Sequence, residues 1–153
     1  MENHDEDRYL EEYGEGALRA AAATFTLPGA PMVYYGQERG ATDYRGPMPW
    51  HDGDAALTAY HRSLSRCRAA RPALRSGGVE RLDRTVIGGD PEAVTAYARD
   101  DGDERLLVAL HFGQGTATVD PGERHGGTDL LTDDEVGEGA VAVEDCVVLR
   151  GRR

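Results

Sequence analysis

The stretch TLPGAPMVYYGQERG, residues 26–40, decides how the first half of the chain should fold. It contains the run PMVYYG, from Pro31 to Gly36, in which bulky and β-branched residues lie between two residues that break regular structure. A short apolar run bounded in this way is typical of a β-strand that is buried on both faces. The sequence therefore predicts a buried strand over residues 31–36.

Helical patterns flank this predicted strand. Residues 16–27 are rich in alanine and repeat apolar side chains at helical spacing until Pro28 and Gly29 interrupt the pattern. Residues 54–70 carry a second apolar stripe, formed by Leu57, Tyr60, Leu64 and Cys67. The order helix, buried strand, loop, helix is typical of an α/β barrel or a layered α/β sheet.

Beyond Pro72 the pattern changes to short strands separated by Gly, Asp or Pro. Seven strands are predicted, over residues 79–82, 85–88, 93–99, 105–112, 116–119, 128–132 and 140–150. Short strands at close spacing predict an antiparallel β-sandwich. We therefore expect an α/β part over residues 1–75 and a sandwich domain over residues 76–153.

Charge restricts the classes of partner. The 153 residues include 28 acidic residues against 17 basic ones, none of them lysine, and the net charge is −11. Nucleic acids and anionic membranes are themselves negative, so neither is an expected partner. An acidic, lysine-free chain with only two phenylalanines is typical of a halophile, and a haloarchaeal source is predicted.

The cysteines and the apolar runs argue against further classes of protein. The two cysteines, Cys67 and Cys146, lie far apart and predict small core residues rather than a disulfide framework or a zinc site. No apolar run reaches the roughly 20 residues of a membrane helix. The N-terminus has no basic region followed by an apolar stretch, so a cytoplasmic location is predicted.

Three motifs in order resemble the α-amylase family of glycoside hydrolases: ENHDEDR at residues 2–8, the stretch at 26–40, and RGPMPW at 45–50. That family has a catalytic (β/α)8 barrel followed by an antiparallel β-sandwich. The resemblance implies that residues 1–75 run from the loop after barrel strand 7 to helix 8. We therefore expect an α/β fragment of a (β/α)8 barrel followed by an all-β sandwich, the C-terminal part of an α-glucan-active enzyme.

The same resemblance assigns candidate site residues. Asp5 matches the carboxylate that stabilises the oxocarbenium-like transition state, and His4 and Asn3 match neighbouring sugar contacts. Glu38 and Trp50 are further candidates for binding substrate. From the residues alone, Asp5 and His4 could belong to a solvated tail, Glu38 could form a loop salt bridge, and Trp50 could pack over the barrel top.

The bond-cleaving carboxylates have no counterpart in this sequence. Retaining glycosidases use a pair of carboxyl groups roughly 5–5.5 Å apart, and the family draws them from barrel strands 4 and 5. The nearest superficial match, Arg99-Asp100-Asp101, ends a predicted sandwich strand and is discounted. The chain by itself is therefore expected to be inactive. No calcium-loop spacing occurs, and neither a metal nor a cofactor is predicted.

Two other functions share these features. One is a non-catalytic carbohydrate-binding or assembly module built on the sandwich, and the other is a transglycosylase such as a trehalose synthase. For the hydrolase, the expected ligand is an α-1,4-linked glucan or maltooligosaccharide. Self-association through residues 16–36 is also predicted, because a barrel strand without its neighbours leaves unpaired edges.

Overall fold

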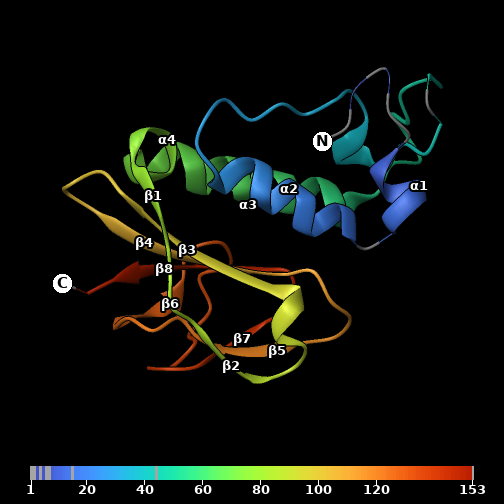
Figure 1. The fold of residues 1–153 in the computed structure, drawn as a ribbon. Helices are drawn as coiled ribbons and strands as arrows, with labels where there is room; N and C mark the ends of the chain where they lie inside the picture. Colours follow the sequence, from blue (N-terminus) through green and yellow to red (C-terminus); the bar gives the residue numbers. More distant parts are fainter. Residues whose placement is uncertain (1–2, 4, 6–7, 15, 44, 153) are drawn as a thin grey trace.

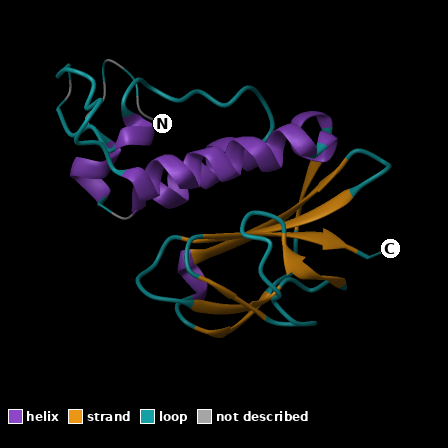
Figure 2. Ribbon diagram, turned by 180° about the vertical axis from the view of Figure 1, so that it is seen from behind, coloured by secondary structure: helices purple, strands orange, loops and turns teal. Residues whose placement is uncertain are grey.

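The computed structural model describes residues 3, 5, 8–14, 16–43 and 45–152. Its elements form three layers (Figure 1). Helices cover one face of a five-stranded sheet, and the other face of that sheet packs against a three-stranded sheet. Figure 2 shows the same segregation of helices from strands from behind.

The helical layer comes from the first half of the chain. Its helices are α1 (Tyr9–Tyr13), α2 (Gly16–Thr26), α3 (Ala55–Ala70) and α4 (Pro72–Ser76), with a 3₁₀ turn η1 at Gln37–Arg39. The Asp54 carboxylate caps α3 by accepting hydrogen bonds from the N–H groups of Ala56 and Leu57. The helices predicted over residues 16–27 and 54–70 are confirmed as α2 and α3.

Every strand pairing is antiparallel, as the sandwich prediction requires. The strands are β1 (Gly78–Arg81), β2 (Thr85–Gly88), β3 (Val94–Asp100), β4 (Arg105–His111), β5 (Ala117–Asp120), β6 (His125–Asp129), β7 (Val141–Val143) and β8 (Cys146–Gly151). A 3₁₀ turn η2 (Pro91–Ala93) precedes β3. The larger sheet has the order β1-β3-β4-β8-β6, and the smaller has the order β2-β5-β7.

Two of the predicted strands are wrong in detail. The strand predicted at 128–132 lies earlier, at 125–129, because the Asp129 carboxylate accepts hydrogen bonds from the Leu131 N–H and the Thr132 hydroxyl and turns the chain. The single strand predicted at 140–150 is two strands, which separate at Glu144–Asp145. β7 belongs to the smaller sheet and β8 to the larger, so the chain crosses between sheets at that point.

The buried strand predicted at residues 31–36 does not form. The segment has no regular secondary structure until Tyr34 and then turns into η1, and Met32 and Val33 are exposed rather than buried. A strand is stabilised by ladder hydrogen bonds to neighbouring strands, and among the described residues none pairs with this segment. The arrangement expected of a barrel, with a strand inside its helices, is therefore not observed in the described part of residues 1–75.

The two faces of the central strand β4 supply two separate cores. Leu106, Val108 and Leu110 point toward the helices and pack with Phe25, Leu64 and Leu74. Leu107 and Ala109 alternate with them and pack against the smaller sheet. The helices thus bury an apolar face that the larger sheet would otherwise expose to water.

Two buried arginines hold the C-terminal end of α2. Arg68, from α3, donates to the carbonyl oxygens of Phe25, Leu27, Gly29 and Leu74. Arg99, from β3, donates to the carbonyl oxygens of Thr26, Gly77 and Gly78. A helix ends in carbonyls without partners and in negative partial charge, and a guanidinium satisfies both. Burial lowers the pKa of both arginine side chains.

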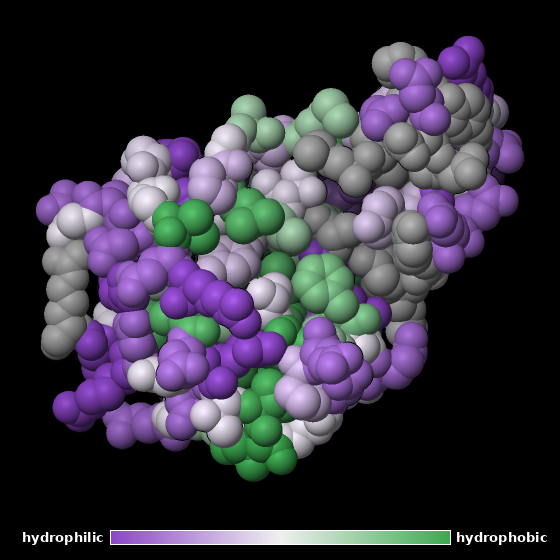
Figure 3. Space-filling view, viewed as in Figure 1, coloured by the Kyte–Doolittle hydropathy of each residue, from purple (hydrophilic) through white to green (hydrophobic). Residues whose placement is uncertain are grey.

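The surface matches the acidic composition. Hydrophilic residues dominate the face shown in Figure 3, and hydrophobic atoms gather there in separate groups rather than in one patch. In the part of the chain that the structure describes, no helix has the length and apolar character needed to cross a bilayer.

We expect Arg99→Met to lower the free energy of unfolding by about 3 kcal/mol, because it leaves buried carbonyls without a charged donor. Urea denaturation followed by circular dichroism measures this change. Arg150→Met is the matched control, since Arg150 is largely exposed and its ion pair with Glu104 lies at the surface. Equal destabilisation by the two substitutions would contradict the role given to Arg99.

Acid should weaken the sandwich through Glu123. Its carboxylate accepts hydrogen bonds from Arg105 at 2.6 and 2.9 Å, and this pairing lowers the pKa of Glu123 below its usual 4.5. A carboxyl group with a lowered folded-state pKa stabilises the fold above its unfolded value and loses that stabilisation as pH falls through the folded value. Glu123→Gln should therefore flatten the loss of stability below pH 4.5.

Denaturation midpoints across an acid series measure this effect. Arg105→Met removes the partner of Glu123 and should give a profile at least as flat as that of Glu123→Gln. Parallel profiles for wild type and Glu123→Gln would contradict the assignment.

Candidate functional site

Arg8 joins the N-terminal residues to the segment that follows α2. Its side chain is buried, and it donates from Nε to the Asp43 carbonyl and from Nη1 to the Tyr35 carbonyl, each at 3.1 Å. The guanidinium also lies over the rings of Tyr34 and Tyr35, at 4.6 and 5.1 Å from their centroids. Sequence analysis did not single out Arg8, because its partners lie at least 26 residues away.

The Tyr34–Tyr35 pair packs beneath Arg8 and also supports the following loop. The two rings meet edge to face at 5.0 Å, and the Tyr35 hydroxyl donates to the Gly46 carbonyl at 2.6 Å. Gly36 follows with φ of +78°, and a Cβ there would come within 2.9 Å of the Ala41 side chain. Glycine is therefore required where the chain turns into η1.

Arg39 fixes the backbone of the loop that carries Trp50. Its guanidinium donates to the Pro49 carbonyl through Nε and Nη2, at 3.2 and 2.9 Å, and to the Trp50 carbonyl at 2.8 Å. Trp50 is 72% exposed. An exposed aromatic ring on a fixed backbone can stack on a ligand at little cost in conformational entropy.

Glu38 lies in η1, directly before Arg39. The Thr58 hydroxyl of α3 donates to its backbone carbonyl at 2.7 Å, which ties η1 to α3. No ion pair of its carboxylate is found among the described residues, so the structure gives no support for a loop salt bridge.

Glu38 and Trp50 line one hollow of about 390 Å³ between the segment of residues 27–36 and α3. Val33, His61, Arg62 and Ser65 are among the other residues that line the hollow. It thus combines an aromatic face with a carboxylate, a guanidinium and a hydroxyl. Sugars offer hydroxyls that donate and accept and C–H faces that stack on aromatic rings, so this combination suits a polyol.

The N-terminal candidates lie elsewhere. Asn3 accepts a hydrogen bond from the Asp5 N–H at 2.8 Å, and Asp5 is exposed. Neither residue is among those that line the hollow, and His4 lies outside the described residues. The structure therefore brings Glu38 and Trp50 together but does not bring Asn3 and Asp5 to them.

The discounted Arg99-Asp100-Asp101 segment has a structural role in this fold. Arg99 holds the end of α2, Asp100 forms an ion pair with Arg105 at 3.4 Å, and Asp101 accepts from the N–H groups of Asp103 and Glu104. Asp100 and Asp101 thus shape the turn between β3 and β4.

Both cysteines of the chain pack among apolar side chains. Cys67 is buried in the core and Cys146 is partly buried against the same core. Burial raises the pKa of the Cys67 thiol to about 11 and also raises the pKa of Cys146. Among the described residues, no three His, Cys, Asp or Glu side chains form a group that could hold a metal ion.

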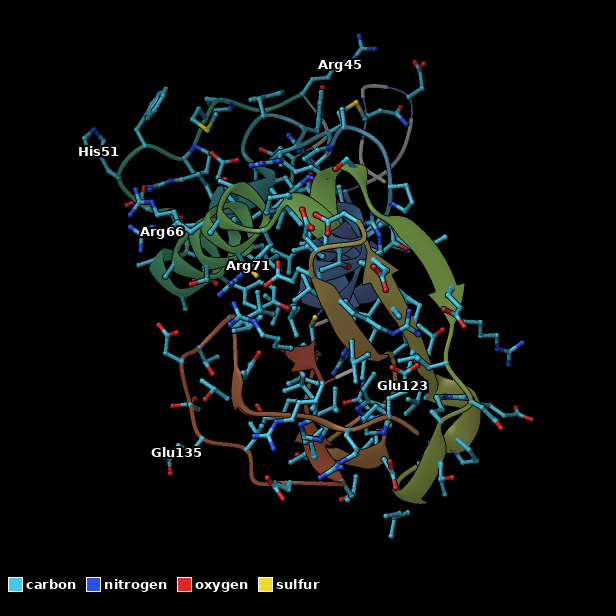
Figure 4. The ribbon with its side chains drawn as sticks, turned by 90° about the vertical axis from the view of Figure 1, so that its left-hand side faces the viewer. Arg45, His51, Arg66, Arg71, Glu123 and Glu135 are labelled. Carbon is cyan, nitrogen blue, oxygen red and sulfur yellow. The ribbon has the colours of Figure 1, made fainter. Side chains whose placement is uncertain are left out.

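Figure 4 shows Arg45 and His51 at the loop end of the molecule, away from Glu123 and Glu135 on the sandwich.

No family model matches the chain, but individual proteins do. The α-amylase MalA of Haloarcula japonica is 40% identical over 133 residues, which cover 86% of this chain and 20% of that protein. α-Amylase 2 of Dictyoglomus thermophilum is 32% identical and is matched over 73% of this chain and 22% of its own length. This chain thus spans about a fifth of the length of these curated relatives.

Solved structures are similar to this chain as well. The cyclic α-maltosyl-(1→6)-maltose hydrolase of Arthrobacter globiformis is 30% identical with a TM-score of 0.69, over 97% of this chain and 34% of its own. The trehalulose synthase MutB of Pseudomonas mesoacidophila has a TM-score of 0.79 over 99% of this chain and 42% of its own, at 17% identity, which shows a shared fold alone.

The relatives of this chain are therefore α-amylase-type glycoside hydrolases.

We expect Arg39→Met to release the loop that holds Trp50. Because Trp50 is the one tryptophan of the chain, the anisotropy of its fluorescence reports local motion directly. Anisotropy should fall in Arg39→Met and stay unchanged in Arg81→Met, which alters an exposed arginine on β1. An unchanged anisotropy in Arg39→Met would show that other contacts hold the loop.

Proposed function

We propose that this chain is the C-terminal part of an α-glucan-active glycoside hydrolase of the α-amylase type. The observation that carries the proposal is the 40% identity with MalA across 86% of the chain. The three ordered motifs support it, because they correspond to the end of the barrel in this family. Residues 1–75 are assigned to that barrel end and residues 76–153 to the sandwich domain.

In this proposal the polar residues of the first 50 positions contact sugar. Asp5 acts as the transition-state stabiliser, since its carboxylate can strengthen hydrogen bonds to sugar hydroxyls as charge develops on the ring. His4 and Asn3 bind hydroxyls beside it. Glu38 and Trp50 bind a glucose unit from the hollow that they share, with the indole stacking on the sugar ring.

The ligand proposed is an α-1,4-linked glucan or maltooligosaccharide, bound without a cofactor. The chain by itself binds but does not cleave it, because no pair of bond-cleaving carboxylates is assigned in this sequence. The acidic composition and the Haloarcula relative support a haloarchaeal source.

A non-catalytic carbohydrate-binding module is the second candidate. The observation that favours it is the exposed Trp50 at the hollow, which would serve binding equally well without catalysis. The two functions differ in the larger protein: the hydrolase needs Asp5 for turnover, whereas the module needs only the hollow.

Titration of the purified chain with maltoheptaose, followed by Trp50 fluorescence, tests the binding proposal. A saturable change is expected, and Glu38→Gln should weaken binding by roughly tenfold, as loss of a charged hydrogen-bond partner implies. Glu92→Gln on the sandwich is the matched control and should bind like wild type. No fluorescence change at millimolar maltoheptaose would contradict a sugar site at the hollow.

Reducing-sugar release by the same preparation tests the expected lack of cleavage. The chain should release no more than a blank without protein. Release that Asp5→Ala abolishes would contradict this expectation.

A further inference from the structure

His125 is a buried histidine whose two ring nitrogens both face carbonyl oxygens. The residue begins β6 in the sandwich and is 3% exposed. Its Nδ1 lies 2.7 Å from the Gly126 carbonyl oxygen, and its Nε2 lies 2.7 Å from the Gly139 carbonyl oxygen. The second contact joins β6 to the end of the connection that leads into β7.

Together these two contacts require a proton on each ring nitrogen. A carbonyl oxygen only accepts hydrogen bonds, so both nitrogens have to donate. A neutral imidazole has a single N–H, and its other nitrogen would direct a lone pair at a carbonyl oxygen 2.7 Å away. The imidazolium satisfies both contacts. The buried residues His61 and His111 differ, because each directs Nδ1 at one carbonyl oxygen and a neutral ring can donate to it.

The charges around His125 balance one another. The charged groups on the elements around the ring are Asp120 at the end of β5, Glu123 and Arg124 in the turn before β6, Glu138 in the connection, Arg105 on β4, Arg150 on β8 and Arg152 after β8. Arg105 pairs with Glu123, Arg152 with Glu138, and Arg150 with Glu104. Asp120 and Arg124 are left, with opposite charges. The two carbonyl contacts are therefore the local feature that favours the positive ring.

The connection between β6 and β7, residues 130–140, depends on the Gly139 contact. The Arg152–Glu138 ion pair also holds it, but both side chains are more than half exposed, and such pairs contribute little. The Val136 N–H donates to the Gly127 carbonyl at 2.9 Å, so this amide reports whether the connection lies against β6. Release of Gly139 would leave the connection with few buried contacts beyond this backbone pairing.

We propose that His125 is a pH-operated clasp: its imidazolium fixes the connection between β6 and β7 to the sandwich, and its neutral form releases Gly139. Gly126 is the bonded neighbour of His125, whereas Gly139 lies 14 residues away, so the Gly139 contact is the one that opens. The contact stabilises the fold in acid and is lost as the ring gives up its proton. The proposal is independent of saccharide binding, because the clasp lies within the sandwich.

Hydrogen exchange of the whole chain, measured by NMR between about pH 5 and 8, tests the clasp, since histidine commonly changes charge in this range. Rates are expressed as protection factors, which remove the intrinsic effect of pH on exchange. The protection factor of the Val136 amide should fall at least about tenfold as His125 loses its proton, as the loss of a charge-assisted hydrogen bond implies. The ¹⁵N resonances of the His125 ring report its protonation in the same samples.

His125→Gln keeps a side-chain donor that does not titrate, and it should make the protection of Val136 independent of pH. His51→Gln is the matched control on an exposed loop and should keep the wild-type profile. Protection of Val136 that does not follow the charge of the His125 ring in the wild-type chain would overturn the proposal. A ring with one unprotonated nitrogen while Val136 stays protected would overturn it equally, whether or not His125→Gln folds.

Discussion

The rest of the structure depends on how the end of α2 is held. Arg68 reaches it from α3 and Arg99 reaches it from β3, and both place a buried guanidinium against backbone carbonyls. The Thr26 hydroxyl meets the Tyr97 hydroxyl at 2.6 Å at the same point. Charged donors at a helix C-terminus satisfy the unpaired carbonyls and oppose the macrodipole. One helix end therefore links the helical layer to the sandwich.

The position of the candidate site follows from this link. The segment of residues 27–36 starts where α2 ends, and the carbonyls of Leu27 and Gly29 accept from Arg68. The segment then leads to η1, which carries Glu38, and to the loop that carries Trp50. Thr58 holds η1 through the Glu38 carbonyl, and Arg39 holds the loop through the Trp50 carbonyl. The backbone on both sides of the hollow is therefore fixed by hydrogen bonds.

Local patterns were sufficient for much of the fold. The helical spacing of apolar residues in the alanine-rich stretch predicted α2, and the apolar stripe of residues 54–70 predicted α3. Turn residues predicted most strand ends close to where the structure has them. The prediction at residues 31–36 failed because a strand is defined by its pairing partners, which an apolar run does not specify. The division of residues 140–150 depends on which sheet each half joins, and that is a tertiary property.

The site was predictable only in part, and by resemblance rather than by pattern. Glu38 and Trp50 were chosen from family motifs, and the structure places them in one hollow. The sequence did not predict that Arg8 and Arg99 bind distant backbone carbonyls. These carbonyls lie 21 to 73 residues away, and every residue type has a backbone carbonyl, so no residue pattern identifies the acceptor. Asp5 and His4 still rest on the motif alone.

Native-state hydrogen exchange across a denaturant series most directly tests whether the helical layer and the sandwich form one cooperative unit. Amides of α2 around Ala22 to Phe25 should open with the same free energy as those of β4 around Leu107 to Ala109. Met32 and Val33, which lack partners in the described part of the chain, should exchange fast throughout. Opening of α2 at markedly lower free energy than β4 would contradict the account.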